Sequence, residues 1–218
     1  LLASSPDGQW IYMARVKGLD PHVVYRWPVD GSKGPAAFLG EPGKPGSDNA
    51  HFNGLVGFDC DSQGRLYAAD SANNRLQIFS PEGKYLKTMP LDRPGLVRVH
   101  RKSGAIYAQH AATIEGKSVS RLTKFASFDN PAKEFHVDGL GSSQMALDSW
   151  SAKPRLWMAG EVKAFKPYGS EPESWHGLRI HEEEGGKFRV LLDFDETARK
   201  EAGETYMGGW AGDCFDKS

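Results

Sequence analysis

Residues 57–75 of this chain read GFDCDSQGRLYAADSANNR. Two short apolar runs are each followed at once by a polar segment, first Asp-Ser-Gln-Gly and then Asp-Ser-Ala-Asn-Asn-Arg. A stretch so rich in carboxylates is either an active-site loop or a pair of turns between β-strands. Asp and Ser side chains accept hydrogen bonds from turn N–H groups, and Gly adopts the positive φ that hairpin turns need. Repetition along the chain decides between the two interpretations.

The pattern occurs four times. It is found in the segments SPDGQWIYMAR (5–15), DSQGRLYAADS (61–71), RKSGAIYAQHA (101–111) and SAKPRLWMAGE (151–161). Each segment has a polar turn, then one residue, then an aliphatic and an aromatic residue. The aromatic residues are Tyr12, Tyr67, Tyr107 and Trp157, at intervals of 55, 40 and 50 residues. These intervals scatter around the length of one propeller blade.

Strand-like runs surround each of these turns. Runs before the turn lie at 1–4, 55–60, 96–100 and 144–148, and runs after the aromatic strand lie at 22–27, 75–80, 121–126 and 177–182. A shorter fourth run lies at 85–89, 134–137 and 187–194. Four strands per repeat predict an all-β fold, a β-propeller of four-stranded antiparallel blades. The exception is 195–204, where the pattern predicts one or two turns of surface helix.

The spacing predicts a single propeller domain over residues 1–218. We expect blades at about 1–40, 53–90, 95–138 and 143–194, and the start of a fifth at 207–218. The chain begins with Leu1 and ends in what looks like the opening of another unit. We therefore expect it to be part of a longer polypeptide, and the remainder of that polypeptide or a partner chain to complete the propeller.

Residues 66–86, LYAADSANNRLQIFSPEGKYL, closely resemble the NHL repeat. In that family a strand ends in Asp, a turn carries Asn-Asn-Arg, and an alternating strand leads to a Pro/Asp-x-Gly turn. The segments 96–137 and 144–194 keep the rhythm but lack the Asn-Asn-Arg. The resemblance implies a propeller of the NHL type, and such propellers usually have six blades.

Within such a fold the polar residues of the opening stretch have a structural role. Asp61 and Gly64 are expected to form one hairpin turn, and Asp70 with Asn73 and Asn74 to stabilise the next. In the same way, Glu-Glu-Glu at 182–184 is expected to be a solvated hairpin tip.

A functional site is expected where the blades converge on the central channel. The register places the end of one strand and the start of another at the same face of the disc. Five side chains are thereby predicted to point toward one channel mouth: Asn53, Asp70, His51, His110 and Arg15. Neutral His and carboxylate could bind a divalent metal, whereas Arg and His could hold an anionic ligand. The remaining alternative is that these groups only solvate the mouth.

Asn53-Gly54-Leu55 is similar to the Asn-Gly-Leu of the gluconolactonase-like family, in which the Asn is a calcium ligand. The resemblance implies Asp70 as its partner, although the family's other ligands have no clear match here. Peptidyl-hydroxyglycine lyases, which are also NHL-type propellers, use His ligands for zinc, and this implies His51 and His110. Calcium and zinc are therefore the candidate metals.

Two long segments, 28–53 and 160–176, exceed a hairpin loop and are rich in Gly and Pro. Long loops on a rigid scaffold commonly carry recognition. Phe165, Tyr168 and Trp175 lie between charges in the second segment and are candidates for gripping a protein or sugar. The alternative is that the loop packs against the rim of the disc.

The cysteines Cys60 and Cys214 fall near the same point of the first strand in blades three apart. In a six-bladed disc these positions lie on opposite sides of the channel, beyond the Cα separation of about 7 Å that a disulfide allows. We therefore predict no disulfide.

Composition narrows the range of possible functions further. Charged residues make up 25% of the chain and the net charge is −1, so no strong field favours nucleic acid. No apolar run approaches the roughly 18 residues of a membrane span. Our first hypothesis is a ligand- or protein-binding or scaffolding module in a secreted or periplasmic protein. The second is a metal-dependent hydrolase or lyase that acts at the channel mouth.

Overall fold

The computed structural model describes residues 1–149, 151–162 and 176–202. These residues form four four-stranded antiparallel sheets, and each sheet takes four consecutive strands in chain order. Blade 1 contains β1 (Leu2–Ser4), β2 (Trp10–Met13), β3 (Val24–Pro28) and β4 (Ala36–Leu39). Blade 2 contains β5 (Leu55–Cys60), β6 (Leu66–Asp70), β7 (Arg75–Phe79) and β8 (Tyr85–Pro90), with the short helix η1 (Ser71–Asn73) between β6 and β7.

The second pair of blades has longer strands. Blade 3 contains β9 (Val97–Val99), β10 (Ile106–Ile114), β11 (Lys117–Phe125) and β12 (Lys133–Asp138). Blade 4 contains β13 (Gly141–Leu147), β14 (Arg155–Val162), β15 (His176–Glu184) and β16 (Lys187–Asp193), and is followed by α1 (Phe194–Ala202). The helix predicted at 195–204 is therefore present, and it packs on β15 and β16.

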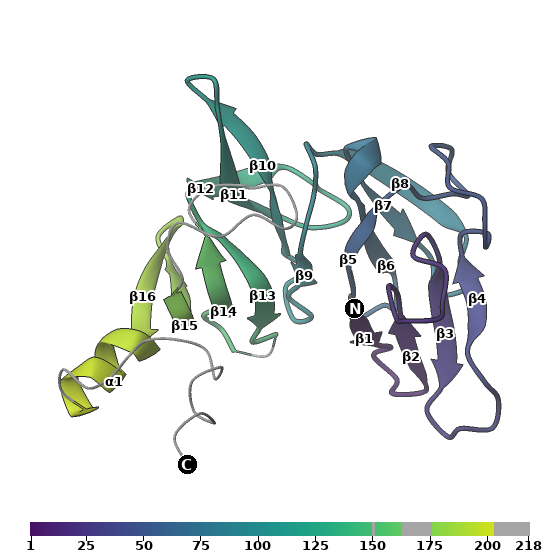
Figure 1. Ribbon diagram of the computed structural model, residues 1–218, viewed down its shortest axis with the longest axis horizontal. Coiled ribbons are helices and arrows are strands. Elements are labelled where there is room, and N and C mark those ends of the chain that lie inside the picture. Colours follow the sequence, from purple (N-terminus) through teal and green to yellow (C-terminus); the bar gives the residue numbers. More distant parts are fainter. Residues whose placement is uncertain (150, 163–175, 203–218) are drawn as a thin grey trace, which may run out of the picture.

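The four sheets are arranged as the blades of a β-propeller, which confirms the predicted fold class (Figure 1). The first strands of successive blades lie side by side, β1 by β5, β5 by β9 and β9 by β13. Gly57 permits one of these close approaches, because a Cβ there would lie 2.3 Å from the carbonyl oxygen of Gly95. Val99 of β9 also donates its N–H to Asp59 of β5 at 2.8 Å.

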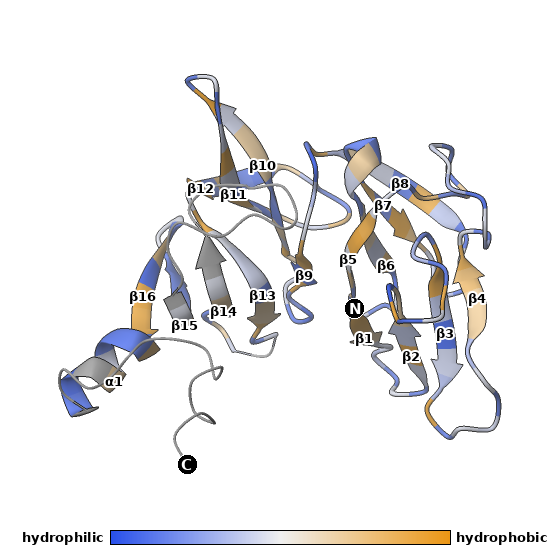
Figure 2. Ribbon diagram, viewed as in Figure 1, coloured by the Kyte–Doolittle hydropathy of each residue, from blue (hydrophilic) through white to orange (hydrophobic). Residues whose placement is uncertain are grey.

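Most of the core lies between the blades, and a smaller cluster of Met13, Val23 and Tyr25 lies within blade 1. Three apolar clusters fill the interfaces of blades 1 and 2, 2 and 3, and 3 and 4. Tyr12, Tyr67 and Tyr107 are each almost wholly buried in one of these clusters. The fourth aromatic residue of the repeat, Trp157, is instead 47% exposed. In Figure 2 most of the hydrophobic residues lie on the strands, where they alternate with hydrophilic ones, and the connecting turns are mostly hydrophilic.

Two local features differ from what the sequence alone indicated. The segment 28–53, expected to be a long loop, contains β4, the fourth strand of blade 1. The strands β10 and β11 form one continuous hairpin whose turn residues, Glu115 and Gly116, both have positive φ (50° and 76°). This is the backbone of a two-residue hairpin turn, in which Glu stands where Asn or Asp is usual before the Gly.

The described residues include only one of the two cysteines in the disulfide prediction. Cys60 is a free, buried thiol on β5, and burial raises its pKa to about 12. Cys214 lies outside the described residues, as does the fifth-blade start expected at 207–218. No helix in the described part of the chain is long and apolar enough to cross a membrane.

Candidate functional site

A buried arginine fastens the loop between β4 and β5 to blade 2. The guanidinium of Arg75 donates to the carbonyl oxygens of Ser47 (2.6 Å), Asp48 (2.7 Å) and His51 (2.9 Å). Its Nε donates to Oδ2 of Asp70 at 2.8 Å. One planar side chain with five N–H donors thus satisfies three loop carbonyls and one carboxylate. We call residues 40–53 the clamped loop.

Asp70 completes this network from the end of β6. Its side chain is fully buried. Oδ1 accepts the Asn53 N–H at 2.7 Å, and Oδ2 accepts Asn73 Nδ2 at 2.7 Å in addition to Arg75. Asn73 also donates to the carbonyl oxygen of Gly46 at 2.8 Å. A buried charge paired and hydrogen-bonded on every side is stable in the interior, but it costs several kcal/mol when one partner is removed.

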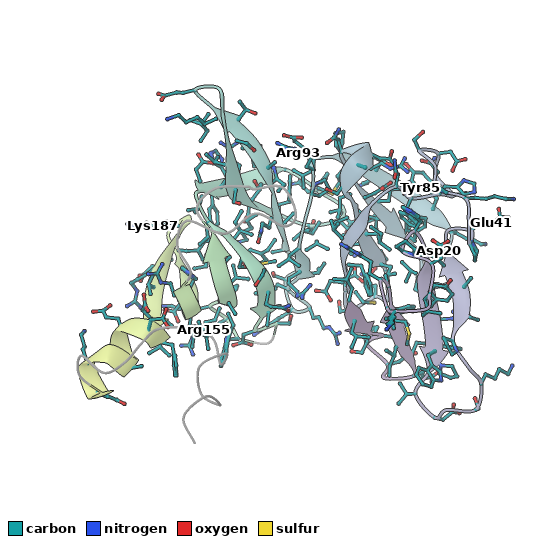
Figure 3. The ribbon with its side chains drawn as sticks, viewed as in Figure 1. Asp20, Glu41, Tyr85, Arg93, Arg155 and Lys187 are labelled. Atoms are coloured by element: carbon teal, nitrogen blue, oxygen red, sulfur yellow. The ribbon has the colours of Figure 1, made fainter. Side chains whose placement is uncertain are left out.

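Asp20 fixes the clamped loop at its other end (Figure 3). Its Oδ2 accepts the N–H of Gly43 at 2.7 Å and its Oδ1 accepts the N–H of His22 at 2.8 Å. These two backbone donors, Gly43 first, lower the pKa of the Asp20 carboxyl. His22 in turn approaches the Gly54 N–H with its Nδ1, at 3.4 Å. The loop is therefore held from both blade 1 and blade 2.

Charged side chains of alternating sign lie on the clamped loop. Glu41 pairs with Lys44 at 2.5 Å, and His51 lies between Asp48 (2.7 Å) and Glu41 (3.7 Å). The hydrogen bonds from Lys44 and from His51 lower the pKa values of Glu41 and Asp48 respectively. The loop thus presents a rigid backbone with fixed ions on its surface.

The structure brings together three of the five predicted mouth residues. His51, Asn53 and Asp70 belong to the Arg75 network, and the Asn53 side chain remains exposed. Arg15 is exposed just after β2, in the left-handed region with φ 52°. The three candidate recognition residues Phe165, Tyr168 and Trp175 lie outside the described residues.

His110 lies within β10 rather than at its end, and its side chain is buried. Its Nε2 is 2.8 Å from Oγ1 of Thr123, and its Nδ1 is 2.7 Å from the carbonyl oxygen of Ala111. Burial lowers the pKa of His110 and so favours the neutral ring. Both ring nitrogens have protein partners, which is the arrangement of a packed histidine.

The described residues contain no group of three or more His, Cys, Asp or Glu side chains placed to hold a metal ion. At Asp70, both side-chain oxygens already accept hydrogen bonds from protein groups. The decisive residues for this site were Arg75 and Asp20. Arg75 ends the Asn-Asn-Arg of the opening stretch, so its position was marked in the sequence, whereas nothing near Asp20 indicated its partner 23 residues later.

The acidic run 182–184 is not the solvated tip that the sequence suggested. Glu182 is buried and pairs with Arg155 (3.0 Å) and Arg189 (3.2 Å). Glu183 reaches blade 3, where it accepts hydrogen bonds from Lys124 (2.7 Å) and from the Tyr107 hydroxyl. Only Glu184 is exposed. Period-two alternation places 182 and 184 on one face and 183 on the other. Glu182 finds its cations within blade 4, whereas the cation of Glu183 belongs to blade 3.

Comparisons with known proteins establish the fold. No protein-family model matches the chain, and no curated protein sequence is similar to it. Solved structures are similar at 12–16% identity. A chain of a nidogen/laminin complex matches 87% of this chain over 63% of its own length, with a TM-score of 0.57. A putative 6-phosphogluconolactonase from Bacteroides uniformis matches 88% over 53%, with a TM-score of 0.54.

A third similar structure is the β-propeller domain of the Trilobed protease from Pyrococcus furiosus. It matches 89% of this chain over 58% of its own length, with a TM-score of 0.54. The chain therefore spans a little over half the length of the propellers that it resembles. At these identities the likeness shows the propeller fold and nothing finer, because enzymes and binding proteins share that fold.

Proposed function

We propose that this chain is a ligand- or protein-binding module built on an NHL-like propeller, and that it recognises its partner with the face of the disc that carries the clamped loop. The observation that carries this proposal is the Arg75 network. Three charge-assisted hydrogen bonds from Arg75, whose guanidinium also pairs with Asp70, hold the loop before any ligand arrives. A preorganised loop loses little conformational entropy on binding, and this raises affinity.

The exposed groups on the loop fit a polar partner. Glu41, Lys44 and Asp48 have side chains 52%, 64% and 66% exposed, yet each is fixed by a neighbour. Fixed charges of both signs favour complementarity and partner choice more than raw affinity. A protein surface or a polar small molecule suits this arrangement better than a nucleic acid does, since the net charge is −1.

The alternative function is a metal-dependent hydrolase or lyase at the channel mouth. It would need Asp70 or His110 as ligands, with Asn53 and His51 beside them. Asp70 would have to release Asn53, Asn73 or Arg75, and His110 would have to release Thr123 or Ala111. These existing hydrogen bonds favour the binding function.

Peptides selected by display on the immobilised protein test the proposal, because selection finds binding hot spots without a known partner. The variant E41A/K44A should weaken the selected peptides by about tenfold or more, a loss of about 1.4 kcal/mol. The matched control E82A/K84A removes an exposed acid and base from the turn between β7 and β8, at the other end of blade 2. Peptides that respond equally to both variants would contradict the proposed surface.

A metal titration tests the alternative on the same protein. Calorimetry with Zn²⁺ and with Ca²⁺ measures stoichiometry on the wild type and on the variants D70N and H110Q. One equivalent of either metal, lost in those variants, would favour the enzyme and count against the binding module. We expect the two variants to leave any residual metal binding unchanged.

A further inference from the structure

The dipeptide Asn53–Gly54, which joins the clamped loop to β5, is the single Asn-Gly pair of the sequence. Asn53 is exposed. In such a pair the Gly nitrogen can attack the side-chain amide carbon of Asn, because glycine has no side chain to hinder the approach. The attack closes a cyclic succinimide and releases ammonia. It requires removal of the proton from the Gly nitrogen, so a base at that nitrogen and a donor at the peptide oxygen both favour it.

A histidine ring lies at the Gly54 nitrogen. The Gly54 N–H points to Nδ1 of His22, with 3.4 Å between the two nitrogens. A ring nitrogen that accepts a hydrogen bond carries no proton, so Nδ1 can receive one. The His22 backbone is held by Asp20, whose Oδ1 accepts its N–H at 2.8 Å. Hydrogen bonds to a catalytic base are often long in the resting state and shorten as the proton moves.

The oxygen of the same peptide group already accepts a hydrogen bond. Ala72 of η1 donates its N–H to the Asn53 carbonyl oxygen at 3.0 Å. When the Gly54 nitrogen loses its proton, the negative charge is shared with this oxygen, so the Ala72 donor stabilises the anion as an oxyanion hole does. The peptide group is therefore contacted at both of its reactive ends, by His22 at the N–H and by Ala72 at the oxygen.

The main chain is anchored on both sides of this peptide group. Asp70 accepts the Asn53 N–H at 2.7 Å, and Ser71 donates its N–H to the Gly54 carbonyl oxygen at 2.9 Å. With the backbone fixed, the reaction needs little more than rotation of the exposed Asn53 side chain toward the nitrogen. Holding the attacking group in place beforehand raises the rate of an intramolecular reaction.

We infer that Asn53 is a self-catalysed modification site at which His22 acts as the base. Nδ1 of His22 takes the proton of the Gly54 N–H, the Gly54 nitrogen attacks Cγ of Asn53, and the bond from Cγ to Nδ2 breaks. The proton held by His22 passes to the leaving nitrogen, which departs as ammonia. Water then opens the succinimide at either carbonyl carbon and leaves an aspartyl or an isoaspartyl residue at position 53. Each event consumes one water and releases one ammonia.

Either product places a new carboxylate at the end of the clamped loop. The isoaspartyl product also routes the main chain through Cγ. This adds a carbon between the N–H that Asp70 accepts and the carbonyl group that Ser71 contacts. The modification thus alters both the charge and the anchoring of this face of the disc, and the site does not depend on which partner that face binds.

Peptide mapping by mass spectrometry of the full 218-residue chain, incubated at physiological pH and temperature, measures conversion at Asn53. Enzymatic methylation of isoaspartyl residues measures that product separately. We expect conversion to be several-fold faster in the folded chain than in the chain unfolded by guanidinium chloride at the same pH. Asn49 is an internal reference, because it is exposed in the same loop but the following N–H, of Ala50, donates to the Asp48 carboxylate at 2.9 Å. Asn49 should stay intact.

The variant His22→Gln removes the base and keeps the backbone hydrogen bond to Asp20. It should slow conversion at Asn53 about tenfold or more, because a positioned general base contributes about 10²–10⁴-fold. The control His136→Gln alters an exposed histidine on β12 and should convert at the wild-type rate. Circular dichroism checks that both variants are folded, and the comparison of folded with unfolded wild type needs no variant. Conversion no faster in the folded chain than in the unfolded one, equal conversion at Asn49 and Asn53, or a wild-type rate in folded His22→Gln would overturn the inference.

Discussion

At the scale of single residues, Arg75 determines whether the clamped loop is ordered. We expect Arg75→Ala to cost about 3–5 kcal/mol, because it leaves the buried Asp70 carboxylate without its cation. Amide hydrogen exchange should show lost protection at Gly46 and Asn53, whose N–H groups bond to Phe52 and Asp70. Arg75→Lys keeps the charge without the planar fork and should be intermediate.

Arg65 provides the matched control for this prediction. It also pairs through Nε with a buried carboxylate, that of Asp61, at 2.6 Å. Arg65→Ala should lower stability without changing exchange at Gly46 and Asn53. Equal exchange at these two amides in both variants would show that Arg75 does not clamp the loop.

His110 gives the stability a pH dependence. Burial lowers its pKa below that of the unfolded chain, about 6.5. Below pH 6.5 the unfolded state therefore binds more protons than the folded state, and stability falls as pH decreases toward the folded-state pKa. The thermal midpoint of wild type should drop between pH 7 and pH 5, and His110→Gln should flatten that slope.

The control for the pH experiment is His136→Gln, on β12, where the side chain is 40% exposed. It should leave the slope as in wild type. A slope that is the same in His110→Gln and wild type would assign the acid sensitivity to other groups, of which buried His100, whose pKa burial also lowers, is the first to test.

At the scale of elements, the contact between β11 and β15 depends on Glu183. This carboxylate accepts hydrogen bonds from Lys124 of β11 and Tyr107 of β10. Glu183→Leu should cost about 2 kcal/mol, because Lys124 keeps its other partner, Glu134 at 2.8 Å, while the Tyr107 hydroxyl loses its acceptor. Denaturant melts of Glu183→Leu, Tyr107→Phe and the double variant measure the coupling. Strictly additive effects would mean that the bond contributes nothing.

Element order was predictable from the sequence because each blade repeats a turn, an aliphatic residue and an aromatic residue. Period-two alternation of polar and apolar residues also located β7 and β11, although every residue of β7 is buried. The strand β4 was hidden, since AAFL between Gly-Pro segments is too short to show a period. The Asp20 and Glu183 contacts were hidden for another reason. Asp20 reaches Gly43 because β3 pairs with β4, and Glu183 reaches Lys124 because blades 3 and 4 stack.

Contacts between residues far apart in the sequence were also hidden at the candidate site. The sequence indicated that Asp70 and Asn73 stabilise a turn, and their hydrogen bonds have that form. It did not indicate that Arg75 reaches across to three carbonyls of a loop more than 20 residues earlier. The sequence does not show which carbonyl groups a guanidinium binds, because every residue has a backbone carbonyl group.

At the scale of the whole molecule, stability is expected to spread through blade interfaces. The blade interfaces join neighbouring blades, and Arg101 of blade 3 also donates to the carbonyl oxygen of Ser4 in blade 1 at 3.2 Å. The total is therefore expected to be close to a sum of blade and interface contributions. The interface of blades 2 and 3 is the central one, and fully buried Ile106 lies in it with Tyr67 and Leu76. Ile106→Ala should cost about 2–5 kcal/mol through lost burial and a residual cavity.

Hydrogen exchange distinguishes this nearest-neighbour behaviour from a single cooperative core. In Ile106→Ala, protection should fall in β5–β8 and β9–β12, on both sides of the altered interface, and less in β1–β4. Leu156→Ala, in the interface of blades 3 and 4, should shift the loss to β9–β16. If instead both variants lower protection uniformly in all four blades, the disc unfolds as one unit, and the interfaces cannot act as separate contributions to its stability.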